Sequence, residues 1–314
     1  MIPFRITIFS FLILFSFISC KEKSSSENQS LAASDSEVVL EVVAPKKQLS
    51  NAFKAYWYAG EAEITSYKLE QARYGELRDG NAVLIYVTEP FLPEKQVKAD
   101  TKNPENVSVL KLNATKNFLT GIYPYSILSS TFYPVHDNQH ALKTSLSVQE
   151  WCGHVYAQIN NRNTFEFTSH SYFEKEADQK LSLEKELLEN EVWTKIRINP
   201  FDLPVGEIKV IPSLEYLRLS HKKIEAYGAT GALSSENGMG TYTLTYPDLE
   251  RTLQIYFSPE FPYTIQGWSE EFKSGFGPNA KVLTTKATKI KSLNTPYWSQ
   301  NSNADLSLRD SLGL

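Results

Sequence analysis

Short runs in which apolar and polar residues alternate dominate the chain after about residue 60, and turn-forming residues separate them. The run Glu61–Leu69 alternates with one slip at Thr65-Ser66, which predicts a half-buried strand with a bulge. Asp79-Gly80 and Asn237-Gly238 each lie between two β-prone runs, so both predict hairpin turns. Further strands are predicted at Ser108–Leu112, Leu142–Gln149, Cys152–Ile159, Thr164–Ser171, Glu207–Ile211, Glu215–Leu219, Lys223–Gly228, Thr241–Tyr246, Arg251–Phe257, Tyr263–Trp268 and Lys281–Ser292.

One segment departs from this alternation and predicts an amphipathic helix over about residues 182–196. Leu183, Leu187, Val192 and Ile196 recur at roughly helical spacing, and glutamates and lysines fill the other face. Ser182 can cap the start, and the helix must end before Pro200. We expect this helix to cover one face or one mouth of a curved sheet.

The predicted fold is therefore mainly β. It is an antiparallel curved sheet, a barrel, a half-barrel or a sandwich, with the one helix. The 17 Tyr and 17 Phe residues agree with a β-rich fold. The β-rich domain is expected to occupy residues 49–314, and two subdomains divided near Phe201 are an alternative.

The N-terminus has the pattern of an export signal. Arg5 precedes the apolar stretch Ile6–Ile18, which is short for a membrane-spanning helix and typical of a signal peptide. The end of this stretch, Phe17-Ile18-Ser19-Cys20, resembles a bacterial lipoprotein lipobox. The resemblance implies that residues 1–19 are removed and that Cys20 is lipidated. Residues 20–48 then form a flexible tether, and the protein is anchored in the cell envelope, at the periplasmic face of the outer membrane or at the cell surface.

Composition excludes some classes of protein and limits the chemistry that the cysteines can perform. The formal net charge of −4 leaves no excess of cations to neutralise phosphates, which excludes a basic nucleic-acid-binding protein. An aromatic content of 12% excludes a disordered acidic chain. Two cysteines cannot make a disulfide scaffold. If Cys20 is lipidated, Cys152 remains as a lone thiol, either buried or reactive.

Residues 132–154 hold the densest group of potentially reactive side chains, His136, His140, Cys152 and His154. Imidazole and thiolate are zinc ligands, and Cys152 and His154 would lie on one face of a strand. A Cys–His nucleophile is a second interpretation. A hairpin with solvated histidines and a buried cysteine is the third, and it requires no cofactor.

Aromatic residues near turns and strand ends form the other candidate site, with Trp57, Tyr58, Trp268 and Trp298 as candidates for stacking on a ligand. At the mouth of a barrel they would stack on sugars or cover a lipid pocket. Ordinary packing within the sheet is the alternative explanation. The chain has no Gly-rich phosphate loop, no Gly-x-Ser-x-Gly elbow and no His-Glu-x-x-His helix.

Several segments look familiar as a set: Tyr56–Ile64, Gln71–Glu76, Phe91–Asp100, Gln149–Gly153, Ser274–Ala280 and Leu308–Leu314. They resemble an uncharacterised group of Bacteroidota lipoproteins that is labelled "septum formation inhibitor Maf". Maf nucleotide pyrophosphatases carry a Ser-Pro-Arg-Arg motif, which does not occur here. The resemblance therefore implies an envelope lipoprotein and supplies no site residue.

Together these patterns predict a lipid-anchored, non-catalytic envelope protein that binds a lipid, a glycan or an envelope partner in the concavity of a curved sheet. The alternative is an envelope hydrolase or zinc-dependent enzyme centred on Cys152 and His154. A structural component of a larger envelope assembly is a third hypothesis.

Overall fold

The computed structural model describes residues 47–101, 103–136 and 139–314. The predicted signal peptide, Cys20 and nearly all of the predicted tether lie outside these residues. The described residues from Lys47 onward group into one compact unit, with no division at Phe201. None of the described helices is both long and apolar enough to cross a membrane.

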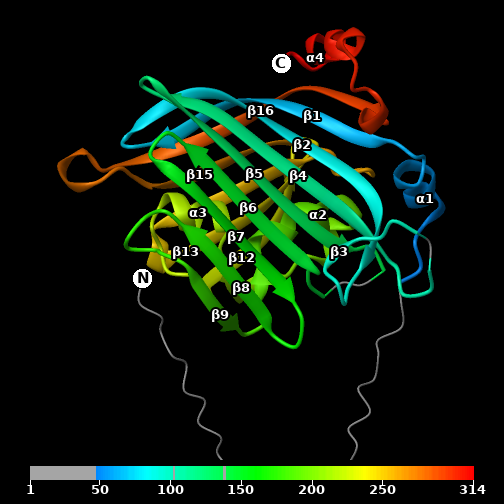
Figure 1. Ribbon diagram of the computed structural model, residues 1–314, viewed down its shortest axis with the longest axis horizontal. Helices are drawn as coiled ribbons and strands as arrows, with labels where there is room; N and C mark the ends of the chain where they lie inside the picture. The colour runs from blue at the N-terminus through cyan, green and yellow to red at the C-terminus, as the bar shows by residue number, and fades with distance from the viewer. Residues whose placement is uncertain (1–46, 102, 137–138) are drawn as a thin grey trace, which may run out of the picture. The chain divides into compact units, whose positions relative to one another are not determined.

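One large sheet of 16 strands forms most of this unit (Figure 1). The strands are β1 (Ala62–Arg73), β2 (Glu76–Leu92), β3 (Val97–Lys98), β4 (Val107–Thr120), β5 (Tyr123–Pro134), β6 (Lys143–Glu150), β7 (Gly153–Asn161), β8 (Phe165–Ser171), β9 (Gln179–Leu183), β10 (Leu187–Leu188), β11 (Gly206–Ile211), β12 (Tyr227–Glu236), β13 (Met239–Tyr246), β14 (Arg251–Phe257), β15 (Ile265–Ser274) and β16 (Lys281–Thr295).

The strands pair in the order 10-11-12-13-14-15-16-1-2-4-5-6-7-8-9, and β3 adds to β2. Every pair is antiparallel except β10 with β11. The two ends of this order, β9 and β10, do not pair, so the sheet is open and does not close into a barrel. The predicted mainly β fold with a large antiparallel sheet is confirmed, in its open form.

Turn chemistry explains both a correct and a wrong hairpin prediction. Asn237 and Gly238 have φ of 50° and 75° and join β12 to β13, as predicted. Asp79-Gly80 forms no turn, because β2 runs straight through it. The turn between β1 and β2 is instead Tyr74-Gly75, with φ of 56° and 77°. The bulge expected at Thr65-Ser66 is confirmed one residue later, because the pairing register of β1 with β16 shifts between Ser66 and Tyr67.

The helices differ more from the prediction. The expected helix over 182–196 is wrong in its first half, because residues 179–183 form β9 and Leu187-Leu188 form β10. Helix α2 begins at Glu189 and spans Glu189–Ile198. The predicted strand Glu215–Leu219 is wrong and belongs to helix α3 (Leu214–Leu219). The predicted strand over 223–228 is also wrong except at its end, since β12 begins at Tyr227.

The described chain contains two further helices, α1 (Asn51–Trp57) near the start of β1 and α4 (Ser307–Leu312) at the C-terminal end. Short 3-10 turns lie at Pro200–Asp202, Pro247–Leu249, Gly277–Asn279, Tyr297–Ser299 and Asn303–Leu306.

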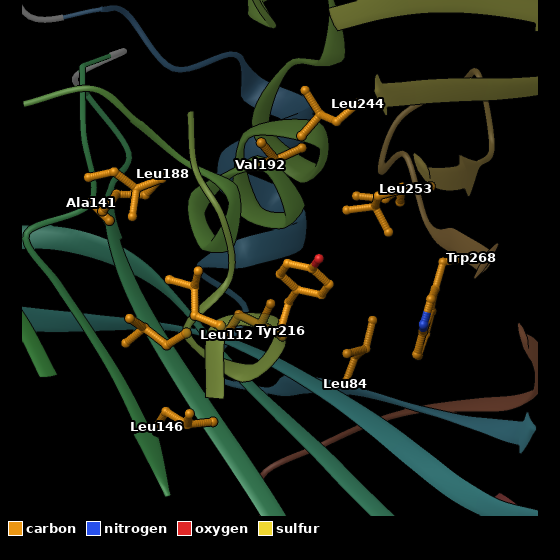
Figure 2. Close-up of a cluster of buried hydrophobic side chains, with 14 of the residues drawn as sticks. Leu84, Leu112, Ala141, Leu146, Leu188, Val192, Tyr216, Leu244, Leu253 and Trp268 are labelled. Atoms are coloured by element: carbon orange, nitrogen blue, oxygen red, sulfur yellow. The ribbon is translucent and has the colours of Figure 1, made fainter. Parts of the chain in front are cut away.

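The hydrophobic core lies between the sheet and helices α2 and α3. Leu84 of β2, Leu112 of β4 and Trp268 of β15 point toward Val192 of α2 and Leu253 of β14 (Figure 2). One continuous cluster of buried apolar side chains includes residues from both halves of the sheet. Burial of apolar surface on this scale is the main force that holds the sheet around the helices.

Candidate functional site

Helix α2 lies inside the concavity of the sheet, although much of its surface is charged. Glu189, Glu191, Lys195 and Arg197 are all buried. A buried charge is costly unless it is paired and hydrogen-bonded. The partners of these four side chains therefore explain how a polar helix is accommodated in the core.

The first partner set joins α2 to β1. Arg197 Nη1 and Nη2 each donate to a carboxylate oxygen of Glu63 at 2.6 Å, and both side chains are almost fully buried. Burial alone would raise the pKa of Glu63, but the charge and hydrogen bonds of Arg197 lower it below its usual range. Tyr56 also donates to Glu63, at 2.5 Å. Burial and the nearby carboxylate raise the pKa of Tyr56 to about 12, so it stays a donor.

The second set joins the start of α2 to β14 and β15. Arg251 donates to Glu189 at 2.5 and 2.6 Å and to Glu270 at 2.7 Å. The Tyr246 hydroxyl donates to Glu189 at 2.6 Å. Burial would raise the pKa of Glu189, and the charge of Arg251 outweighs it and lowers that pKa. These bonds fix α2 to both halves of the sheet, which is a structural role.

A small cavity remains beside α2, lined by Trp193 and Trp268 and by the ion pair Lys116–Glu215, with Nζ and Oε1 2.7 Å apart. Its volume of about 60 Å³ is far below the roughly 300–1,000 Å³ of typical ligand pockets. Among the described residues, no buried polar side-chain atom that lines it lacks a hydrogen-bond partner. The cavity is suited to a few water molecules and offers nothing for a larger ligand.

A larger groove of about 470 Å³ lies between α3 and the inner face of β7, β8 and β9, the three strands at one edge of the sheet. Strand alternation explains its apolar wall, because every second residue of β7 and β8 points inward. Its apolar lining consists of Val155, Ala157, Phe167, Leu181, Leu214, Leu217 and Ile224. Leu181 of β9 is 41% exposed on this inner side, so the groove is open to a ligand. This volume falls within the range of small-molecule sites.

Basic side chains surround the groove. Lys175, Arg218, His221, Lys222 and Lys223 line it, together with the acidic Glu176.

Glu176 is bonded to Arg218 Nη1 at 3.0 Å and to His221 Nδ1 at 2.8 Å. Partial burial would raise the pKa of Glu176, but these two neighbours lower it. Among the described residues, Lys175 and Lys222 have no ion-pair partner, and the buried Nε of Arg218 has no hydrogen-bond acceptor. The groove thus combines an apolar wall with two exposed lysines and with an arginine whose Nε has no acceptor among the described residues.

The four predicted metal ligands separate into two pairs at opposite ends of β6. His140 precedes β6, whereas Cys152 and His154 follow it, so eight extended residues, roughly 25 Å, separate the pairs. Zinc–ligand bonds are only about 2 Å long, so the four side chains cannot share one ion. Within the described ranges, no group of three or more His, Cys, Asp or Glu side chains is placed to hold a metal.

Three of these residues have other contacts, and the fourth, His154, is exposed on β7. His140 Nδ1 bonds to Glu191 at 3.0 Å, and His136 Nδ1 lies 3.1 Å from the carbonyl oxygen of Lys47. Cys152 is exposed in the β6–β7 turn, which contradicts the buried position considered for it. A hydrogen bond with Glu150 and its negative charge raise the pKa of the Cys152 thiol, which disfavours the nucleophilic thiolate.

The four candidate aromatics do not form a common surface. Trp57 and Trp268 are buried, and both pack against other rings. Tyr58 and Trp298 are about half exposed; Tyr58 directly follows α1, and Trp298 lies in the short 3-10 turn at Tyr297–Ser299. Core packing explains the first two, and no stacking platform for a sugar results.

Comparison with protein families, with curated proteins and with solved structures finds no match to this chain. Function is therefore inferred from geometry. One feature of the sequence could have indicated the groove, namely the pair Lys222-Lys223 shortly after α3, but Lys223 was assigned to a predicted strand.

Proposed function

We propose that the protein is a lipid-anchored binding protein of the cell envelope that takes an anionic amphiphile into the groove between α3 and β7–β9. The apolar wall would hold an acyl chain, and the basic side chains at the edge of the groove would hold a negatively charged head group. The observation that carries the proposal is this pairing of an apolar wall with Lys175, Lys222 and the unsatisfied Arg218 Nε. A glycan fits less well, because the groove contains few polar acceptors and no stacked aromatic pair.

Binding is testable with cis-parinaric acid, a fatty acid whose fluorescence rises in apolar surroundings. The protein for this test is the chain from residue 20 onward with Cys20→Ala, which contains the whole compact unit. We expect saturable binding to this protein. Leu181→Glu should weaken it at least tenfold, because a carboxylate then faces both the apolar chain and the anionic head. Leu181 lies on an edge strand and is partly exposed, so the fold should tolerate the change.

Lys180→Glu is the matched control, since this neighbour on β9 is exposed and does not line the groove. It should leave parinaric acid binding unchanged. Lys175→Glu with Lys222→Glu should weaken binding, and more so at low salt. Absence of saturable binding, or equal loss in Leu181→Glu and Lys180→Glu, contradicts the amphiphile proposal.

The anchor is tested separately, in the cell that makes the protein. Metabolic labelling with an alkyne fatty acid should tag the protein and place it in the membrane fraction. Cys20→Ala should abolish the tag and release the protein from membranes, because Cys20 is the proposed lipidated residue. Cys152→Ala is the control, since it removes the other of the two cysteines and should keep the tag. Retention of the tag in Cys20→Ala refutes the anchor.

A further inference from the structure

The hairpin turns at one end of the sheet expose large apolar side chains. The β1–β2, β4–β5, β6–β7, β8–β9 and β15–β16 connections all lie at this end, because their strands are antiparallel neighbours. Figure 1 shows the β15–β16 and β4–β5 turns projecting on the left, opposite α1 and β3. Turn tips are ordinarily polar, so this apolar character requires an explanation.

Three adjacent turns and the strand ends beside them carry four of these residues. Leu119, near the end of β4, is 59% exposed, and Ile122 in the β4–β5 turn is 84% exposed. Trp151 of the β6–β7 turn is 69% exposed, and Tyr172 after β8 is 78% exposed. We call Leu119, Ile122, Trp151 and Tyr172 the apolar rim.

The rim is continuous along the sheet. The ring of Tyr123, beside Ile122, lies 6.5 Å from the ring of Trp151. Tyr172 packs over Gly153, where an added Cβ would lie 2.7 Å from the tyrosine ring. Neighbouring turns are two strands apart, or roughly 10 Å. The four side chains therefore form one row that a flat surface can contact at several points.

We propose that the apolar rim is a membrane-contact surface that inserts into the interface of an anionic lipid bilayer. Trp, Tyr, Ile and Leu at exposed tips are the residue types that lie at such interfaces. Lys273 and Lys281, exposed at the β15–β16 turn, supply positive charge at this end of the sheet. The β8–β9 loop does not, because Glu174 and Asp178 are exposed beside Lys175. Lys273 and Lys281 complement anionic head groups.

The chain before the described residues is long enough for this contact. Lys47 lies at the other end of the sheet, where its backbone N–H donates to the carbonyl oxygen of His136 at 3.0 Å. The longest strand that separates the two ends, the 17-residue β2, spans roughly 55 Å. The 27 residues from Cys20 to Lys46 can extend to about 90 Å, so the proposed anchor and the rim can reach one membrane. The rim proposal does not depend on what the groove binds.

Vesicle binding tests the rim with the unacylated chain from residue 20 onward, carrying Cys20→Ala. Cys152 is then the only thiol, and it lies exposed within the rim, so a polarity-sensitive fluorophore can be attached there. With vesicles of equal parts phosphatidylcholine and phosphatidylglycerol, we expect co-sedimentation and a blue shift of the fluorophore. Ile122→Ser with Trp151→Ser should weaken co-sedimentation at least tenfold, because burial of two large apolar side chains is lost.

The matched control is Phe201→Ser with Val205→Ser. These residues are 72% and 63% exposed and lie near Asp202, which pairs with Lys47 at the opposite end of the sheet. This variant should bind vesicles like the parent. Circular dichroism and parinaric acid binding should be unchanged in both variants, which separates the rim from the fold and from the groove. Equal vesicle binding by both variants, no blue shift at Cys152, or a concentration-dependent dimer that only the rim variant loses would overturn the proposal.

Discussion

Replacing Arg197 with methionine is expected to lower the free energy of unfolding by about 3–5 kcal/mol, because the change leaves Glu63 charged and buried without a partner. Methionine fills a similar volume, so loss of packing contributes little. The guanidinium group also lies 4.9 and 4.7 Å from the rings of Trp57 and Tyr86, and those contacts are lost with it. Urea unfolding at neutral pH measures the difference.

Two further variants make this test specific. Arg162→Met removes an exposed pair with Glu166, whose atoms are 3.3 Å apart, and should change stability by less than about 1 kcal/mol. Adding Glu63→Gln to Arg197→Met removes the stranded charge and should restore part of the lost stability. If Arg197→Met costs no more than Arg162→Met, the pair does not stabilise α2 in the sheet.

The pH dependence of this effect has a definite sign. In the parent protein the pKa of Glu63 is lowered, so the stability from the pair is full above the unfolded pKa of about 4.3 and is lost as the pH falls through the folded value. In Arg197→Met, burial without a cation raises that pKa, and protonation relieves the penalty. The difference in stability between the two proteins should therefore shrink as the pH falls from the raised pKa of Glu63 in the variant, through about 4.3, to the lowered pKa of Glu63 in the parent. A constant difference would show that the ionised pair is not its cause.

How far the sequence predicted the fold can be judged from particular segments. Strict alternation located most strands, and Asn237-Gly238 located a hairpin because both residues tolerate positive φ. The segment Glu215–Leu219 was predicted as a strand although its apolar residues Tyr216 and Leu217 are adjacent. It forms a helix, and the Ser213 hydroxyl caps that helix by accepting from the backbone N–H of Tyr216 at 3.2 Å. Ser213 and the missing alternation were the signals that could have shown the helix.

The interior of the concavity could not be predicted in the same way. Periodicity assigns Glu189 and Lys195 to the polar face of a helix, and only tertiary structure shows that face to be buried. Arg197 pairs with a residue 134 positions away, and Glu189 with one 62 positions away. The groove is likewise assembled from β7–β9 and α3, which a single sequence gives no reason to place together. The histidines between residues 136 and 154 mislead in the opposite way. They are close in the sequence, but the extended strand β6 separates His136 and His140 from His154.

Gly80→Ala tests why Asp79-Gly80 lies inside a strand. Gly80 pairs with Leu69 on one side and with Phe118 on the other. A Cβ at this position would overlap the carbonyl oxygen of Asn117 and lie 2.8 Å from Phe118 Cβ. The glycine therefore permits a close approach of β2 and β4. A position can thus require glycine for close strand packing as well as for a turn. Forcing the strands apart should lower the free energy of unfolding by about 1–3 kcal/mol, measured by urea unfolding.

Gly228→Ala is the control, because Gly228 also lies within a strand, β12, and an added Cβ would meet no atom within 4 Å. That change should leave stability equal or slightly higher, since alanine restricts the unfolded chain. Equal behaviour of the two variants would mean that β2 and β4 do not need the glycine. A selective loss in Gly80→Ala would show that backbone proximity, and not turn formation, requires glycine here. The sequence pair Asp-Gly alone does not distinguish these two uses, because both depend on the missing Cβ.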